Sequence, residues 1–458
     1  MQQKRTIYFL GIGGIGMSAL ARYFMHAGDE VYGYDLTPSP LTDQLSVEGA
    51  HIHFTADVSQ IPAQVDFVVY TPAVSKQHAE YQYFVENNIP IYKRSQVLGM
   101  ITQGHRTLAV AGTHGKTTTT SMLAQIFHVA QPVTAFIGGI AKNFDSNLVL
   151  SANAETFIVE ADEFDRSFLT LYPSIAVITS MDADHLDVYG DKSHLVESFQ
   201  QFANQVDKDG ALVICEKVAA KITHPHKMVY GFEPTTDFYA HHIEQWPHKA
   251  AFDVRCPDGQ SRHIELGISG LHNILNATAA FAVAYLSHLS DEVIAAQLRQ
   301  FSGVKRRFDF QVVSDEAVYI DDYAHHPEEI KAFLKAVRQI YPDKQLTGIF
   351  QPHLFSRTRD FASQFAEALS LLDQVILLNI YPAREKPIPG ITSQYLLDMI
   401  PVENKMLLED NQLLDYLKNH RPEVLLTIGA GNIDRFVPKI KALLENPRTE
   451  GTPLCNKT

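Results

Sequence analysis

Two glycine-rich loops, each set between an apolar run and a helix-like run, restrict the fold of this 458-residue chain. The first is GIGGIG at 11–16, which follows the apolar run 7–10, and the second is GTHGKT at 112–117, which follows 107–111. A strand that ends in such a loop and continues as a helix is the opening unit of a parallel α/β sheet. The chain is therefore expected to contain at least two such units.

Short apolar strands alternate with amphipathic stretches along the whole chain and group into three blocks. In the first block, Met17 to Met25 is predicted to be a helix, and EVYGYD supplies a strand that ends at Asp35. This alternation predicts parallel sheets with helices on both faces. The predicted fold class is α/β with three domains: an N-terminal Rossmann-like domain (1–103), a central P-loop ATPase-like doubly wound sheet (104–304) and a C-terminal Rossmann-like α/β domain (305–458).

Composition excludes several classes of protein. A hydrophobic content of 45% with 20% charged residues indicates an ordinary globular protein, and a net charge of -14 argues against a broad nucleic-acid or anionic-membrane surface. Cys215, Cys256 and Cys455 are too widely separated for a metal motif or a disulfide framework. No apolar run approaches the roughly 18 residues that a membrane span requires. We expect a cytoplasmic protein with neither nucleic acid nor membrane as a partner.

The first loop fits the dinucleotide-binding pattern G-x-G-x-x-G through Gly11, Gly13 and Gly16. Asp35 closes the next strand at about the spacing of a ribose-binding acid. Glycines let a pyrophosphate approach the backbone N–H groups at the start of the helix. The loop predicts a diphosphate ligand. NAD, another diphosphate, and a tight turn without a ligand all remain open.

The second loop carries the Gly-Lys-Thr of a Walker A motif at Gly115, Lys116 and Thr117. Lys116 is expected to reach the β and γ phosphates, and the Thr117 hydroxyl to bind Mg²⁺. The motif is a variant, because Val110 stands where the first glycine is usual and Gly112 follows two residues later. The loop predicts ATP.

Acidic residues follow two of the central strands. Glu160 ends the apolar run TFIVE, and Mg²⁺ prefers oxygen ligands, so Glu160 with Thr117 is a sensible pair. Asp162 and Glu163 can be further ligands or solvated loop acids. The strand IAVITS is followed by three polar residues: Asp182, Asp184 and His185. By chemistry alone, His185 is an unusual Mg²⁺ ligand and is better interpreted as a hydrogen-bonded polar residue.

Several long motifs, GTHGKTTTT, VEADEFDRSF, MDADHLDVYG, GLHNILNA, GVKRRFDF, DDYAHHP, FQPHLFSRTRDF and GAGNI, occur in the chain. Together they resemble the Mur ligases of peptidoglycan synthesis across all three blocks. In that family the first loop holds the diphosphate of a UDP-sugar, and the central loop holds ATP. The stretch DADHLDVYG is similar to the branch that joins L-alanine to UDP-N-acetylmuramate.

The resemblance also implies roles for individual residues. The UDP-sugar site would comprise Gly11, Gly13, Gly14, Ile15, Gly16, Asp35 and Thr71. The ATP site would comprise Gly112, Thr113, His114, Gly115, Lys116, Thr117, Thr118, Asn273, Arg306 and Asp322. The metal site would comprise Thr117, Glu160 and His185, and the amino-acid pocket Tyr323, His325 and Arg357. The residues implied in catalysis are Lys116, Glu160, His185, His325 and Arg306.

Two parts of the third block carry further interpretations. Helix capping is the alternative role for His325 and especially for His326, within the stretch HHPEE. Leu354 departs from the family pattern, in which a second arginine often follows the histidine of QPH. Only Arg357, together with Arg359, then remains to hold the carboxylate of the amino acid.

The implied reaction begins with attack of the lactyl carboxylate of UDP-N-acetylmuramate on the γ phosphate of ATP. The acyl phosphate then reacts with the neutral amine of L-alanine, and His325 is the candidate base. The implied cofactors are ATP and two Mg²⁺ ions, which Mn²⁺ can replace, in a monomer or a homodimer. Three alternatives remain: a recycling ligase that adds a whole tripeptide to the same UDP-sugar, an NAD-dependent oxidoreductase, and a non-enzymatic ATP-switched binding module.

Overall fold

The computed structural model describes residues 4–181, 192–383 and 385–445. The chain forms two compact units, Met1–Gly303 and Val304–Thr458. The described residues form three sheets, two in the first unit and one in the second. No helix within the described ranges has both the length and the apolar character to cross a bilayer.

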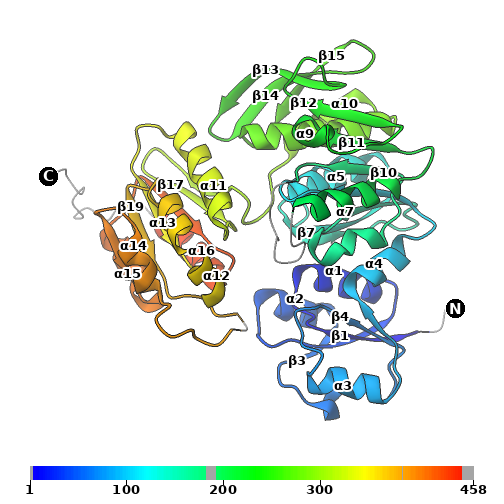
Figure 1. The fold of residues 1–458 in the computed structure, drawn as a ribbon, viewed down its shortest axis with the longest axis horizontal. Coiled ribbons are helices and arrows are strands. Elements are labelled where there is room, and N and C mark those ends of the chain that lie inside the picture. The colour runs from blue at the N-terminus through cyan, green and yellow to red at the C-terminus, as the bar shows by residue number, and fades with distance from the viewer. Residues whose placement is uncertain (1–3, 182–191, 384, 446–458) are drawn as a thin grey trace. The chain divides into compact units, whose positions relative to one another are not determined.

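The amino-terminal sheet of the first unit has five parallel strands in the order β3-β2-β1-β4-β5 (Figure 1). The strands are β1 (Thr6–Leu10), β2 (Glu30–Tyr34), β3 (His51–His53), β4 (Phe67–Tyr70) and β5 (Ile91–Lys93). The helices are α1 (Ile15–His26), α2 (Pro40–Glu48), η1 (Val58–Gln60), α3 (Ala79–Glu86) and α4 (Arg94–Thr102). The strand order reverses at β1, and the carboxyl end of such a central strand is where ligands bind in open α/β sheets.

The start and the end of α2 illustrate how local sequence sets an element. Ser39 is the N-cap, its side chain accepts a hydrogen bond from the Thr42 N–H, and Pro40 occupies the first turn. The helix ends at Gly49, whose φ of 115° is a left-handed conformation that favours glycine.

The second sheet has ten strands in the order β15-β14-β13-β12-β11-β10-β6-β9-β7-β8. The strands are β6 (Arg106–Ala111), β7 (Val133–Ala141), β8 (Ser146–Val149), β9 (Thr156–Glu160), β10 (Ile175–Ile178), β11 (Ala211–Cys215), β12 (Lys227–Gly231), β13 (Phe238–Trp246), β14 (Lys249–Arg255) and β15 (Ser261–Leu266). The helices are α5 (Lys116–Ala130), η2 (Phe164–Thr170), α7 (Lys192–Asn204), α8 (Glu216–Ala219), α9 (Leu271–Leu286) and α10 (Asp291–Gln300). Because β6 lies between β9 and β10, parallel to both, the carboxyl ends of these three strands share one edge.

The sheet of the second unit has six strands in the order β16-β17-β21-β18-β19-β20. The strands are β16 (Asp309–Val313), β17 (Val318–Asp322), β18 (Leu346–Phe350), β19 (Gln374–Leu377), β20 (Lys405–Leu407) and β21 (Val424–Ile428). The helices are α11 (Pro327–Ile340), α12 (Phe355–Asp360), α13 (Ala362–Leu369), α14 (Ser393–Met399), α15 (Asp410–Asn419), η3 (Asn432–Phe436) and α16 (Val437–Glu445). Two apolar clusters cover this sheet, one centred on Phe333 and Phe365 and the other on Leu413 and Ile440.

The α/β fold class predicted from the sequence is confirmed, whereas the domain boundaries near 103 and 304 stay predictions. The predicted parallel pairing holds for most neighbouring strands but not at three places. Strand β8 runs antiparallel to β7, strand β16 to β17, and β13, β14 and β15 form an antiparallel meander. Short connections without a helix join these neighbours, and an antiparallel pair needs no crossover connection.

Helix α5 is the central packing element of the first unit, because it contacts α9, α10 and strand β7. Ile126 in this helix is fully buried, whereas Val129, three residues later, is 57% exposed. We predict that Ile126→Ala lowers the free energy of unfolding by about 2–5 kcal/mol, since a buried cavity replaces the lost side chain. Val129→Ala, the matched control, should change it by less than about 0.5 kcal/mol. Denaturant unfolding of both variants measures the difference, and equal losses would contradict this packing.

Candidate active site

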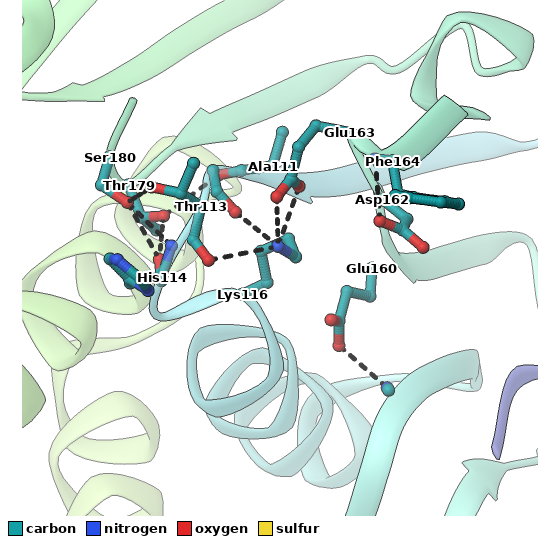
Figure 2. Close-up of polar contacts among 12 residues, drawn as sticks. Ala111, Thr113, His114, Lys116, Glu160, Asp162, Glu163, Phe164, Thr179 and Ser180 are labelled. Atoms are coloured by element: carbon teal, nitrogen blue, oxygen red, sulfur yellow. Dashed lines mark hydrogen bonds and ion pairs between the residues drawn. The ribbon is translucent and has the colours of Figure 1, made fainter. Parts of the chain in front are cut away.

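The central glycine loop joins the carboxyl end of β6 to the amino end of α5. Gly112 and Gly115 have φ angles of 132° and 82°, which glycine adopts without strain. The loop is fixed by Ser180, which follows β10: its Oγ lies 2.8 Å from Thr113 Oγ1 and accepts a hydrogen bond of 2.8 Å from the His114 N–H (Figure 2). The unpaired N–H groups at the start of α5 are thereby presented to an anion, as at other phosphate-binding helix ends.

The Lys116 ammonium lies between this loop and the Glu163 carboxylate in a nearly buried position (Figure 2). It donates to both carboxylate oxygens of Glu163, at 2.8 and 3.0 Å, and to the Gly112 carbonyl at 2.6 Å. Burial alone would lower the pKa of Lys116, but the carboxylates of Glu163, Asp162 and Glu160 outweigh it and raise the pKa above its ordinary value. The lysine therefore stays charged. The alternative that Glu163 is a solvated loop acid is wrong, since its side chain is only 1% exposed.

Thr117 and Glu160 are close together at the same edge. The Thr117 hydroxyl donates to Glu160 Oε1 at 3.1 Å, and the Gly138 N–H donates to Glu160 Oε2 at 2.9 Å. Hydroxyl and carboxylate oxygens are ligands that suit Mg²⁺, so this pair fits the cation that the sequence predicted. The third expected ligand, His185, lies outside the described residues, as do Asp182 and Asp184.

The first glycine loop joins β1 to α1 in the amino-terminal sheet. The Gly13 N–H donates to Asp35 Oδ2 at 2.8 Å, and a Cβ atom at Gly11 would lie 2.6 Å from Thr71 Cγ2. Asp35 and Thr71 therefore lie against the loop, next to Gly14, Ile15 and Gly16 at the start of α1. The Asp35 carboxylate thus accepts a hydrogen bond from a backbone N–H that could otherwise donate to a bound phosphate.

Arg94, which the sequence analysis did not identify, lies next to the first loop and also contacts an acidic residue near the central loop. It is the first residue of α4, directly after β5, and its Nη2 lies 3.3 Å from Asp162 Oδ2. A Cβ atom at Gly16 would lie 3.0 Å from Arg94 Nη1. The guanidinium group thus lies between the first loop and the acids that follow β9. A basic residue at the carboxyl end of a strand was the available sequence signal.

Helix α9 contributes two asparagines near its amino end. Asn273, the predicted adenine contact, is buried, and its Nδ2 donates to the Ser269 carbonyl at 2.7 Å. Asn276 lies closer to the phosphate loop, because a Cβ atom at Gly115 would lie 2.5 Å from Asn276 Oδ1. The adenine contact of Asn273 stays a prediction, and Asn276 is an additional residue of this site.

In the second unit, the side chains of Arg306 and Asp322 form hydrogen bonds with nearby backbone groups. Arg306 Nη2 donates to the Gly429 carbonyl. Asp322 accepts from the Phe308 N–H at 2.7 Å and from the Ala324 N–H at 2.8 Å, while burial raises its pKa to about 6. The predicted contacts of Arg306 and Asp322 with ATP stay predictions.

The three residues predicted for the amino-acid pocket lie in one cluster. The rings of Tyr323 and His325 are 5.2 Å apart, and His353 lies 6.1 Å beyond His325. Arg357 Nη1 is 3.4 Å from His353 Nδ1, so His353, the histidine of QPH, joins the cluster. Arg359, by contrast, is half exposed and pairs with Asp360.

Helix capping explains part of the HHPEE stretch. His326 is the N-cap of α11, and Glu329 Oε2 accepts from the N–H groups of His325 and His326 at 3.0 and 3.2 Å. The His325 ring also faces this cap, since its Nδ1 lies 3.4 Å from Glu329 Oε2 as well as 3.1 Å from the Tyr323 carbonyl. Leu354, where the sequence departs from the family pattern, is the N-cap of α12 with a φ of 72°.

Comparison with known proteins gives consistent matches over the chain. Family models match in succession: "Mur ligase family, catalytic domain" at 6–106, "Mur ligase middle domain" at 110–284 and "Mur ligase, glutamate ligase domain" at 306–431. A UDP-N-acetylmuramate–L-alanine ligase from Flavobacterium psychrophilum is 48% identical over 450 residues, which are 97% of this chain and 99% of the relative.

Two solved structures are also similar. The UDP-N-acetylmuramate-alanine ligase MurC from Thermotoga maritima is 25% identical with a TM-score of 0.82, and the match covers 96% of this chain and 99% of that one. A murein peptide ligase from Psychrobacter arcticus is 23% identical with a TM-score of 0.71, covering 97% and 99%. The second likeness is evidence of a shared fold alone.

Close packing behind the central loop makes Gly112 a sharp test of this site. A Cβ atom there would overlap Thr179 Oγ1 and lie 2.8 Å from the Ser180 nitrogen. We predict that Gly112→Ala weakens ATP binding at least about tenfold, or ~1.4 kcal/mol, because the loop must move. Gly104→Ala is the matched control, since Gly104 also has a positive φ but no atom within 4 Å of a Cβ. Calorimetric titration with ATP compares the two, and equal affinities would refute the assignment of this loop.

Proposed function

Since the chain belongs to the Mur ligase family, we propose that it is an ATP-dependent ligase that joins L-alanine to the lactyl carboxylate of UDP-N-acetylmuramate. ADP and phosphate are the other products, and the reaction belongs to peptidoglycan precursor synthesis in the cytoplasm. The observation that carries the proposal is the presence of two phosphate-type loops in one compact unit, with charged Lys116 under one and Arg94 beside the other.

The central loop binds ATP in this proposal. The N–H groups at the start of α5 and the Lys116 ammonium contact the phosphates, and Asn276 supports the loop from α9. Thr117 and Glu160 would hold Mg²⁺, with His185 as the further ligand for a second ion. Bound Mg²⁺ neutralises charge on the γ-phosphoryl group and on the departing ADP.

The first loop binds the diphosphate of UDP-N-acetylmuramate. The diphosphate would take the place of the Asp35 carboxylate at the Gly13 N–H, and Thr71 lies against the loop at Gly11. Arg94 presents a planar cation between this loop and Asp162, and a guanidinium group binds phosphate or carboxylate through paired hydrogen bonds. The lactyl carboxylate is thereby directed toward the ATP site.

The proposed reaction has two steps, and each step forms one bond and breaks another. A lactyl carboxylate oxygen forms a bond to the γ phosphorus while the bond from that phosphorus to ADP breaks. The neutral amine of L-alanine then forms a bond to the acyl carbon, and inorganic phosphate leaves with its electron pair. Lys116 stabilises charge in the first step, and a base removes the proton from the amine in the second.

His325 is the proposed base. Its Nδ1 faces the Tyr323 carbonyl at 3.1 Å, which favours the tautomer with hydrogen on Nδ1 and leaves Nε2 free to accept a proton. Burial lowers the pKa of His325 below its ordinary value, so the imidazole is neutral at pH 7. The pocket cluster of Tyr323, His353 and Arg357 surrounds it and would hold the amino acid.

Substrate dependence of phosphate release tests the function. With Mg²⁺-ATP, release should require both UDP-N-acetylmuramate and L-alanine, and should be slower with glycine or L-serine. Release with a tripeptide acceptor only would establish the recycling ligase instead. Phosphate release that does not require the UDP-sugar would overturn the proposal. Binding of NADH by the protein would also overturn it. ATP binding without turnover under every condition would favour the ATP-switched binding module.

The pH profile tests His325. A base with a lowered pKa stays unprotonated to lower pH, so the acidic limb of kcat/KM for L-alanine should lie below pH ~6.5. We predict that His325→Gln removes this limb and lowers kcat about 10²- to 10⁴-fold. His326→Gln is the matched control, because His326 caps the start of α11 and its ring packs against Phe361, and this variant should retain the limb. An unchanged limb in His325→Gln would assign the proton transfer to another group.

A further inference from the structure

Three histidines and one aspartate lie together on the antiparallel meander of β13, β14 and β15, at one edge of the central sheet (Figure 1). Strands β10, β11 and β12 separate this meander from β6, which carries the ATP loop. The group has no role in the proposed ligase reaction. Its members are His241, His242, Asp253 and His263.

Strand register accounts for three of these residues. Asp253 on β14 is directly opposite His241 on β13 and directly opposite His263 on β15. Residues in such a cross-strand row point to the same face of a sheet. His263 Nδ1 lies 2.9 Å from Asp253 Oδ1, which shows that the aspartate faces its neighbour along this row.

A bulge adds the fourth residue. Consecutive residues of a regular strand point to opposite faces, so His242 would normally face away from His241. The pairing shifts by one residue between His241 and Glu244, and His242 has a φ of 48°. A β-bulge redirects side chains in this way. The rings of His241 and His242 are therefore only 4.5 Å apart, and His242 Nδ1 lies 2.9 Å from Asp253 Oδ2.

The arrangement has the chemistry of a metal site. Ligand atoms from His241, His242 and Asp253 all lie within 4.8 Å of one another. Two imidazole nitrogens with one carboxylate oxygen suit Zn²⁺ and related transition metals, whereas Mg²⁺ prefers oxygen alone. The His242 side chain is 79% exposed, so an ion reaches it from solvent, while Asp253 is partly enclosed at 25%.

We propose that His241, His242 and Asp253 bind one divalent transition-metal ion of the Zn²⁺ class, independently of the ATP site. His263 acts as a positioning residue, because its hydrogen bond fixes the Asp253 carboxylate from the far side. The ion joins side chains of β13 and β14 across the bulge, where the strand pairing is interrupted. It thereby stabilises the antiparallel edge of the central sheet.

Calorimetric titration of the metal-free, full-length protein with ZnCl₂ tests the proposal, with excess Mg²⁺ present to occupy the Thr117–Glu160 site. The wild-type protein should bind one Zn²⁺ that is missing from His242→Ala and from the near-isosteric Asp253→Asn. His263→Ala should weaken this binding by about 10- to 100-fold, as expected for a residue that orients a ligand. His248→Ala is the matched control from the same hairpin, and it should bind Zn²⁺ like the wild type.

Thermal unfolding gives a second readout that does not depend on activity. Zn²⁺ should raise the Tm of the wild type and of His248→Ala, but not that of His242→Ala, because only a folded-state site stabilises the fold. Similar circular dichroism of all variants without metal shows that each is folded. Equal Zn²⁺ binding in the wild type, His242→Ala and Asp253→Asn would overturn the proposal and leave the group as a hydrogen-bonded His–Asp cluster.

Discussion

The central site depends on the ion pair between the partly enclosed Lys116 ammonium and the Glu163 carboxylate. An ammonium group that loses water needs ionic and hydrogen-bonding partners, and Lys116 has Glu163 on one side and the Gly112 carbonyl on the other. Glu163 reaches it because β9 lies next to β6 in parallel register, with Val110 opposite Glu160. These contacts hold the lysine in place, and in the proposed reaction the ATP phosphates would compete with Glu163 for its ammonium group.

The fold class and the positions of both phosphate loops were predictable, since they rest on local patterns. A strand, a glycine-rich turn and a helix follow one another within about twenty residues, and the backbone conformation of Gly112 or Gly115 depends on those same residues. Asp35 and Thr71 could be placed near the first loop for a related reason, because each follows a strand adjacent to β1. Parallel strands bring such residues to one edge.

Contacts between distant segments were not predictable. The burial of Glu163 depends on the kinked turn that follows β9, where Asp165 and Arg166 have positive φ angles. Arg94 reaches Asp162 only because α4 packs on η2, and Asn276 reaches Gly115 only because α9 packs on α5. The antiparallel meander and its bulge likewise required the register of three strands. No periodic pattern in the local sequence indicates these contacts or the bulge, because they depend on how distant segments pack.

In the proposed reaction, the carboxylate of the UDP-sugar becomes an acyl phosphate at the site around Lys116. The most direct measurement uses UDP-N-acetylmuramate labelled with ¹⁸O in both lactyl carboxylate oxygens, with ATP and L-alanine, followed by mass analysis of the released phosphate. We expect one ¹⁸O atom per phosphate, because a carboxylate oxygen bonds to the γ phosphorus and leaves with it. Phosphate that carries no ¹⁸O while the amide product forms would rule out the acyl phosphate.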